Sequence, residues 1–198
     1  MSVHLTTQKI IKDWTDYNNH MNVAYYVLIF DVYGAEKLMN IFKMGEESAK
    51  TTKKSTMVVE SHITYNQEVK EGDEVEVNLI YFDHDKKRLL YKLEMIHKEK
   101  KYLASTMEIL ALYVDLNERK VAEFENEKVK IMDDFIDRNK SKFNYENLKF
   151  LSIKSSIILT FSSSNSETFL SLRSTYKARI SIVEAKNFFS LCIISSLY

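Results

Sequence analysis

The stretch DWTDYNNHMN, residues 13–22, stands between a strand-like opening and a long helix-like run. It places one carboxylate, three amides and an imidazole within the seven residues from Asp16 to Asn22. The first turn of a helix leaves backbone N–H groups unpaired and partly positive, so it can stabilise a developing oxyanion. An acid such as Asp16 beside that turn can act as a general base or as a nucleophile on a carbonyl carbon. The alternative is that Asp16, Asn18 or Asn19 only caps the helix.

A helical pattern runs from Met21 to Met44. Gly34 within it predicts that another element packs closely there, and Gly45 is a predicted C-terminal cap. The apolar residues fall on one stripe, which we expect to lie against a sheet. The stripe comprises Val23, Val27, Phe30, Gly34, Leu38 and Ile41, with Tyr26 and Tyr33 at its edge.

Alternating apolar and polar residues predict strands on both sides of this helix. The first is expected from about Val3 to Asp13, and four more within residues 56–69, 74–81, 89–95 and 102–114. Short charged turns separate the last four, so we expect antiparallel pairing by hairpins. The last run is apolar on both faces near its end, which indicates a central strand covered on both sides. A short charged helix is expected over residues 125–139, and the periodicity alone gives the α+β class.

The segment from Trp14 to Tyr26 resembles the opening signature of hotdog-fold acyl-CoA thioesterases of the 4-hydroxybenzoyl-CoA thioesterase type. The signature falls on Asp16, Asn18, Asn19, His20, Asn22 and Tyr26. Residues 60–65 and 83–89 are also similar to the branch of this family linked to carnitine and betaine catabolism, and the resemblance extends over residues 6–137. The family usually has glycine where this chain has Asn19, so we expect a positive φ there, which asparagine tolerates.

The resemblance implies a hotdog fold, in which a curved antiparallel sheet wraps around one long helix. It implies a thioesterase domain over residues 1–140, followed by a Ser-rich extension of unknown role over residues 141–198. A single helix covers only one face of the sheet, and hotdog domains usually assemble, so a homodimer or homotetramer is expected. The active site of the resembled family lies at that subunit boundary.

The resemblance also assigns roles in the hydrolysis of a short acyl-CoA. Asp16 would attack the thioester carbonyl or activate water, and His20 would contact the thioester or orient the turn. Backbone N–H groups of His20 and Met21 would hold the oxyanion if the helix starts there. His20 can equally be a hydrogen-bonded structural histidine. The expected substrate-binding residues are Asn19, Met21, Asn22, Tyr26 and Tyr17, although Asn22 and Tyr26 can also be scaffolding.

Four aromatic residues near the turn suggest a cation-binding acyl site, because aromatic faces attract quaternary ammonium groups such as that of betainyl-CoA. They are Trp14, Tyr17, Tyr25 and Tyr26, and their alternative role is in the core or an interface. Basic residues could bind the phosphates of coenzyme A or could simply be solvated. These are Lys53, Lys54, Lys86, Lys87 and Arg88. Glu60 and His62 could border a partner's pocket, but we expect them to be exposed.

The composition excludes several other classes of protein. The 28 basic and 28 acidic residues balance, so a nucleic-acid partner is not expected. The single cysteine, Cys192, excludes an internal disulfide framework and suits a reducing, cytoplasmic location. The histidines lack zinc-site spacing, so neither a metal nor another cofactor is expected. No signal peptide or membrane-spanning run is recognisable. The main alternative function is a non-catalytic hotdog module that binds an acyl group, and a dehydratase-like hotdog enzyme is a further one.

Overall fold

The structure is a computed structural model that describes residues 2–144 and 148. Its strands are β1 (Val3–Lys9), β2 (Lys54–Tyr65), β3 (Glu74–His84), β4 (Arg88–His97), β5 (Leu103–Asp115) and β6 (Lys120–Val121). Its main helical elements are α1 (Val23–Leu28), the π-helical η2 (Ile29–Ala35), α2 (Glu36–Ile41), α3 (Glu46–Thr52) and α4 (Asn126–Asn139). Two short 3-10 turns are η1 (Lys12–Trp14) and η3 (Lys140–Lys142).

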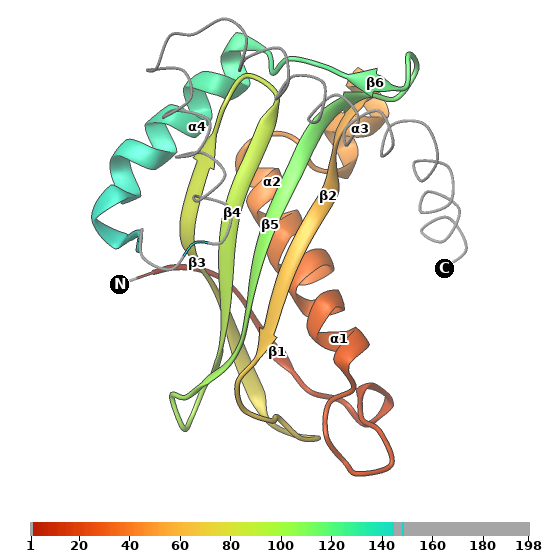
Figure 1. The fold of residues 1–198 in the computed structure, drawn as a ribbon, viewed down its shortest axis with the longest axis vertical. Coiled ribbons are helices and arrows are strands. Elements are labelled where there is room, and N and C mark those ends of the chain that lie inside the picture. Colours follow the sequence, from red (N-terminus) through yellow and green to blue (C-terminus); the bar gives the residue numbers. More distant parts are fainter. Residues whose placement is uncertain (1, 145–147, 149–198) are drawn as a thin grey trace, which may run out of the picture. The chain divides into compact units, whose positions relative to one another are not determined.

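The strands form one antiparallel sheet in the order β1-β3-β4-β5-β2, with β6 added to β5. The continuous helix α1–η2–α2 lies against one face of this curved sheet (Figure 1). The predicted hairpins between β3 and β4 and between β4 and β5 are confirmed. The predicted hairpin between the second and third strands is wrong, because β2 pairs with β5 and β3 pairs with β1 and β4. Residues 66–73 therefore run from the edge strand β2 to β3, which lies next to the opposite edge strand β1. We refer to them as the 66–73 connection.

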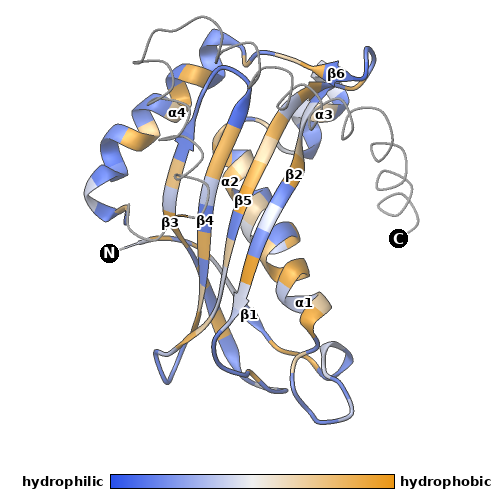
Figure 2. Ribbon diagram, viewed as in Figure 1, coloured by the Kyte–Doolittle hydropathy of each residue, from blue (hydrophilic) through white to orange (hydrophobic). Residues whose placement is uncertain are grey.

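The core lies between the helix and the sheet. Gly34 confirms the predicted close approach, because a Cβ placed there would lie 3.0 Å from Val77 Cγ1 and 3.4 Å from Leu93 Cδ1. Hydrophobic colouring continues along much of β5 and α1, whereas the turn between β4 and β5 is hydrophilic (Figure 2). At the far end of the helix, Phe42 packs against Phe82 and Phe135, which joins α4 to the same core.

The predicted apolar stripe of the helix is only partly correct. Phe30, Gly34 and Leu38 are buried as expected, but Val23, Val27 and Ile41 are 60%, 39% and 43% exposed. The reason is the π-helical segment η2, in which backbone bonds span five residues, as in the bond from the Glu36 N–H to the Asp31 carbonyl. The wider turn shifts the helical phase between the residues before η2 and those after it, so a stripe drawn at one regular spacing cannot follow the buried face along the whole helix. The buried face instead includes Tyr26, Ile29, Ala35 and Met39.

The predicted C-terminal cap at Gly45 is also wrong. The helix ends at Ile41, and Lys43 takes the left-handed conformation with a φ of 56°. Gly45 is instead the N-cap of α3, a helix that sequence periodicity did not indicate. A Cβ at Gly45 would lie too close to the side chain of the exposed Asn40, which would have to move to make room.

β5 and β2 differ in their position in the sheet. β5 lies inside the sheet between β4 and β2, as predicted for the most apolar run. β2 is an edge strand and ends at Tyr65, because the amides of Asn66 and Gln67 both turn to the carbonyl of Ala104. Glu60 is exposed as expected, whereas His62 is partly buried.

The predicted helix over residues 125–139 is confirmed as α4, which Glu125 precedes as N-cap residue. The predicted extension, residues 141–198, lies outside the described residues from 145 on, apart from Leu148. The domain boundary near residue 140 stays a prediction. In the part of the chain that the structure describes, no helix is both long and apolar enough to cross a membrane.

Candidate functional site

Residues 15–21 form a closed loop before the helix. An isolated β-bridge joins Thr15 to Met21 at its base. Inside it, the Asp16 N–H donates to the His20 carbonyl at 2.9 Å, and the Asn19 N–H donates to the Asp16 carbonyl at 3.0 Å. Asn19 has a φ of 61°, which confirms the positive φ expected at this departure from the family signature. Asparagine therefore holds the turn that glycine usually makes.

The carboxylate of Asp16 is held by the backbone of its own loop. Its Oδ1 accepts hydrogen bonds from the N–H groups of Asn18 at 2.8 Å and His20 at 3.2 Å. Its Oδ2 accepts none from the residues that the structure describes, and the side chain is only partly buried. One oxygen thus fixes the orientation of the carboxylate, and the other remains available to a substrate or a water molecule.

The helix begins later than the proposed oxyanion site requires. α1 starts at Val23, and its N-cap is Asn22, whose Oδ1 accepts from the Ala24 N–H at 3.0 Å. The capping alternative for Asp16 is therefore wrong, since Asp16 organises the loop and does not cap the helix. The predicted oxyanion donors are wrong as well. The His20 N–H is bonded to Asp16, and the Met21 N–H donates to the Val69 carbonyl at 2.9 Å.

His20 contacts a residue that the sequence did not suggest. Its Nε2 lies 3.0 Å from Oε2 of Glu68, in the 66–73 connection, and the two side chains are 39% and 54% exposed. Glu68 follows β2 in a charged stretch that looks like an ordinary solvated loop. Glu68 comes close to the loop of Asp16 only because the 66–73 connection runs from β2 to β3.

The residues predicted to bind substrate are dispersed around the loop. Asn19 is exposed at its tip, and Tyr17 is 94% exposed. Met21 is buried in the core at 4% exposure, and Asn22 caps the helix. Tyr26 is also buried, and burial raises the pKa of its phenol, with a smaller opposing effect from a backbone hydrogen bond at Val69.

The four aromatic residues predicted to form a cation site do not converge within one chain. Trp14 stacks on Tyr25 with ring centroids 5.8 Å apart, and Tyr33 lies 6.0 Å from Trp14. Tyr26 instead meets the edge-strand residue Tyr65 edge to face at 5.2 Å. A cage built from all four rings is therefore not present in a single subunit.

The basic residues considered for coenzyme A are partly engaged elsewhere. Lys54 Nζ lies 2.8 Å from Glu125 Oε1, and Lys87 Nζ lies 3.7 Å from Glu123 Oε1. Arg88 Nε donates to Asp85 Oδ2 at 2.6 Å. These contacts fit a structural role, and nothing among them singles out a phosphate-binding residue. Among the described residues, no group of three or more histidine, cysteine, aspartate or glutamate side chains could hold a metal ion.

Comparison with known proteins decides the family. The sequence model of the thioesterase-like superfamily matches residues 11–136, which contain the loop of Asp16 and all of the strands that follow it. The chain belongs to the thioesterase-like superfamily. It is 32% identical over 129 residues to the betainyl-CoA thioesterase of Pseudomonas aeruginosa, covering 64% of this chain and 80% of that protein.

Solved structures agree with this assignment. A putative thioesterase from Pseudomonas putida is 26% identical with a TM-score of 0.64, and the match covers 75% of this chain and 96% of that one. A protein from Staphylococcus aureus in complex with CoA is 24% identical with a TM-score of 0.62, covering 75% and 90%, and supports the fold. The expected hotdog fold and the expected acyl-CoA thioesterase activity are thus confirmed for this thioesterase.

Proposed function

We propose that this thioesterase hydrolyses a short acyl-CoA with Asp16 as its reactive carboxylate. The observation that supports this most directly is the geometry of Asp16. Two backbone N–H groups hold its Oδ1 at 2.8 and 3.2 Å, while Oδ2 is left for the reaction. The loop that carries it lies within the part of the chain matched by the family model.

Two routes use this carboxylate. As a nucleophile, Asp16 bonds to the acyl carbon, the C–S bond breaks, and the thiolate takes a proton; water then hydrolyses the resulting anhydride. As a general base, Asp16 takes a proton from water while the hydroxide adds to the acyl carbon, and the proton passes to the departing thiolate. Both routes convert one thioester and one water molecule into a carboxylic acid and a thiol.

Replacing the carboxylate tests the role of Asp16. Asp16→Asn keeps the shape of the side chain and an oxygen that can accept from the loop amides, so the fold should persist. Steady-state release of free thiol from acyl-CoA should fall by about 100-fold or more. Asp13→Asn, in the exposed part of the same segment, is the matched control and should keep wild-type turnover. Substantial turnover by Asp16→Asn would refute this mechanism. Acyl-CoA binding without turnover by the wild type would favour the non-catalytic acyl-binding module instead.

We further propose betainyl-CoA as the preferred substrate. The 32% identical relative is named for this activity, and Trp14 and Tyr25 form a stacked aromatic pair close to the Asp16 loop. An aromatic face attracts a quaternary ammonium group by about 0.5–2 kcal/mol. Hydrolysis of betainyl-CoA should be compared with that of isovaleryl-CoA, which is similar in size but uncharged. A clear preference for isovaleryl-CoA would exclude the betainyl specificity and leave a general short-chain thioesterase.

We also propose that the enzyme assembles as a homodimer or a homotetramer. β2 is an edge strand that exposes Val58 and Tyr65, each 49% exposed, and α1 exposes Val23 and Val27. Open strand edges and exposed apolar side chains favour association with another chain. Light scattering coupled to size-exclusion chromatography gives the mass in solution. A monomer at the concentrations used in the activity assay would contradict this proposal.

A further inference from the structure

Glu68 is the meeting point of several contacts beside the Asp16 loop. Its Oε2 lies 3.0 Å from His20 Nε2, and its Oε1 lies 3.1 Å from Lys70 Nζ. Its backbone carbonyl accepts a hydrogen bond from the Tyr102 hydroxyl at 2.7 Å. Both the side chain and the backbone of Glu68 are therefore fixed, although half of the side chain is exposed.

The backbone beside Glu68 also holds the Asp16 loop. The Met21 N–H donates to the Val69 carbonyl at 2.9 Å, and an isolated β-bridge joins His20 to Lys70. The loop and the 66–73 connection are thus joined at consecutive residues. This backbone register sets the distance between Glu68 and the imidazole of His20.

The contact with Glu68 has a defined effect on the imidazole. A carboxylate only accepts hydrogen bonds, so His20 Nε2 has to carry the proton of the neutral ring. The other ring nitrogen, Nδ1, then has a free lone pair and can accept a hydrogen bond or a proton. The same logic orients other histidines that donate one ring N–H to a carboxylate.

We propose that Glu68 is a positioning residue that holds His20 in the Nε2-protonated tautomer, with Nδ1 as an acceptor toward the water used in thioester hydrolysis. This inference rests on the proposed function of the Asp16 loop. Glu68 acts through His20 and does not itself touch the reacting atoms. Glu68 is the charged group that lies against the imidazole, at 3.0 Å from Nε2. Lys70 pairs with the other oxygen of the same carboxylate, and Asp16 accepts from the backbone N–H of His20.

The tautomer of His20 can be measured without any substrate. The full chain, labelled with ¹⁵N in its histidine rings, is studied by NMR at mildly alkaline pH, and His20→Asn identifies the His20 signals. Wild-type His20 should show a protonated Nε2 and an unprotonated Nδ1. Glu68→Gln should give a mixture of both tautomers, because an amide can donate as well as accept. Glu71→Gln, an exposed residue of the same connection, should leave the spectrum unchanged.

Kinetics supply the second measurement. Glu68→Gln should lower kcat about tenfold, while KM stays within about twofold of the wild-type value. A tenfold loss is at the lower end of the range seen when a residue that orients a histidine is removed. Glu71→Gln should match the wild type. A wild-type His20 protonated at Nδ1 would overturn the inference with no variant needed. Unchanged kcat in Glu68→Gln, with Asp16→Asn inactive, would overturn it while leaving the proposed function intact. Full turnover by Asp16→Asn would instead refute the proposed function.

Discussion

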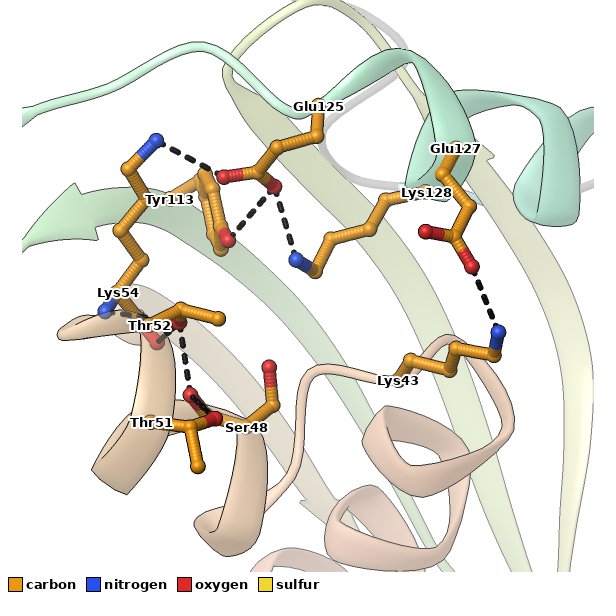
Figure 3. A network of polar contacts seen from close by, with 9 residues as sticks. All are labelled: Lys43, Ser48, Thr51, Thr52, Lys54, Tyr113, Glu125, Glu127 and Lys128. Carbon is orange, nitrogen blue, oxygen red and sulfur yellow. Dashed lines mark hydrogen bonds and ion pairs between the residues drawn. The ribbon is translucent and has the colours of Figure 1, made fainter.

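Glu125 offers the sharpest test of what holds α4 to the sheet. Its carboxylate lies between three donors from three elements, shown in Figure 3. It accepts from Lys54 Nζ of β2 at 2.8 Å, from the Tyr113 hydroxyl of β5 at 2.9 Å and from Lys128 Nζ of α4 at 2.9 Å. The Lys128 ammonium also lies 5.6 Å from the centroid of the buried Tyr113 ring. Glu125→Gln removes the charge while it keeps the shape.

The pKa of Glu125 gives the size of the effect. Burial raises this pKa, but the hydrogen bonds from Lys128, Lys54 and Tyr113 outweigh burial and lower it from 4.5 to about 2. A shift of this size corresponds to about 3 kcal/mol at neutral pH, since one pKa unit is about 1.4 kcal/mol. The Glu125 side chain is 37% exposed, so solvent screening reduces this value to about 1–2 kcal/mol. The melting temperature should fall by about 3–6 °C.

Thermal and urea denaturation followed by circular dichroism measure this loss. Because the folded pKa lies below the unfolded one, the contribution of Glu125 is present above about pH 4.5 and disappears as the pH falls toward 2. The wild type and Glu125→Gln should therefore differ most at neutral pH and converge in acid. Glu127→Gln is the matched control, because Glu127 is on the same helix turn but its ion pair with Lys43 is exposed (Figure 3).

Two results would refute this reasoning. One is a Glu125→Gln variant as stable as the wild type at neutral pH. The other is an equal loss in Glu127→Gln, which would show that any charge removed from this helix turn has the same effect.

Three further changes test individual features of the fold by thermal denaturation. Asn19→Gly should leave the stability nearly unchanged, whereas Asn19→Val should cost about 1–2 kcal/mol. The reason is that a β-branched residue is strained at a φ of 61°. Equal melting temperatures of the two variants would contradict this. Gly34→Ala should cost about 1 kcal/mol, since the added Cβ would press on Val77 at 3.0 Å and outweigh the gain in helix propensity; a more stable variant would show that the core yields there. A chain ending after Asn144 should be more stable by about 2 kcal/mol than one ending after Lys140, because Phe143 is buried and its ring centroid lies 6.3 Å from that of Phe135. Identical melting temperatures of the two chains would show that Phe143 contributes nothing.

Regular alternation was sufficient to predict most of the sheet. Val75, Val77 and Leu79 of β3 alternate with polar residues and are all fully buried. Side chains on a strand point to opposite faces in turn, so this pattern depends only on local geometry. The positive φ at Asn19 was predictable for a similar reason, since few residue types tolerate that conformation.

Errors arose where pairing or packing between distant residues decides the structure. Nothing local in Thr56–Tyr65 indicates that β2 pairs with β5 and not with β3. The sequence does not reveal the π-helical segment η2 either, although it changes the helical phase, and the buried face of the helix includes Tyr26 and not Val27. Such choices are made by the fit of the helix to the whole sheet, so a periodic pattern cannot supply them.

The candidate site divides in the same way. The sequence by itself determined Asp16, His20 and the turn that joins them, because their contacts span at most four residues. Only the tertiary structure decided that the Met21 amide is bonded to the Val69 carbonyl and that Glu68 faces His20. Those contacts depend on the 66–73 connection, which crosses the sheet because β2 and β3 occupy separate positions in it. Strand order is fixed by long-range packing and hydrogen bonding, and it is this order that brings the second half of the site to the first.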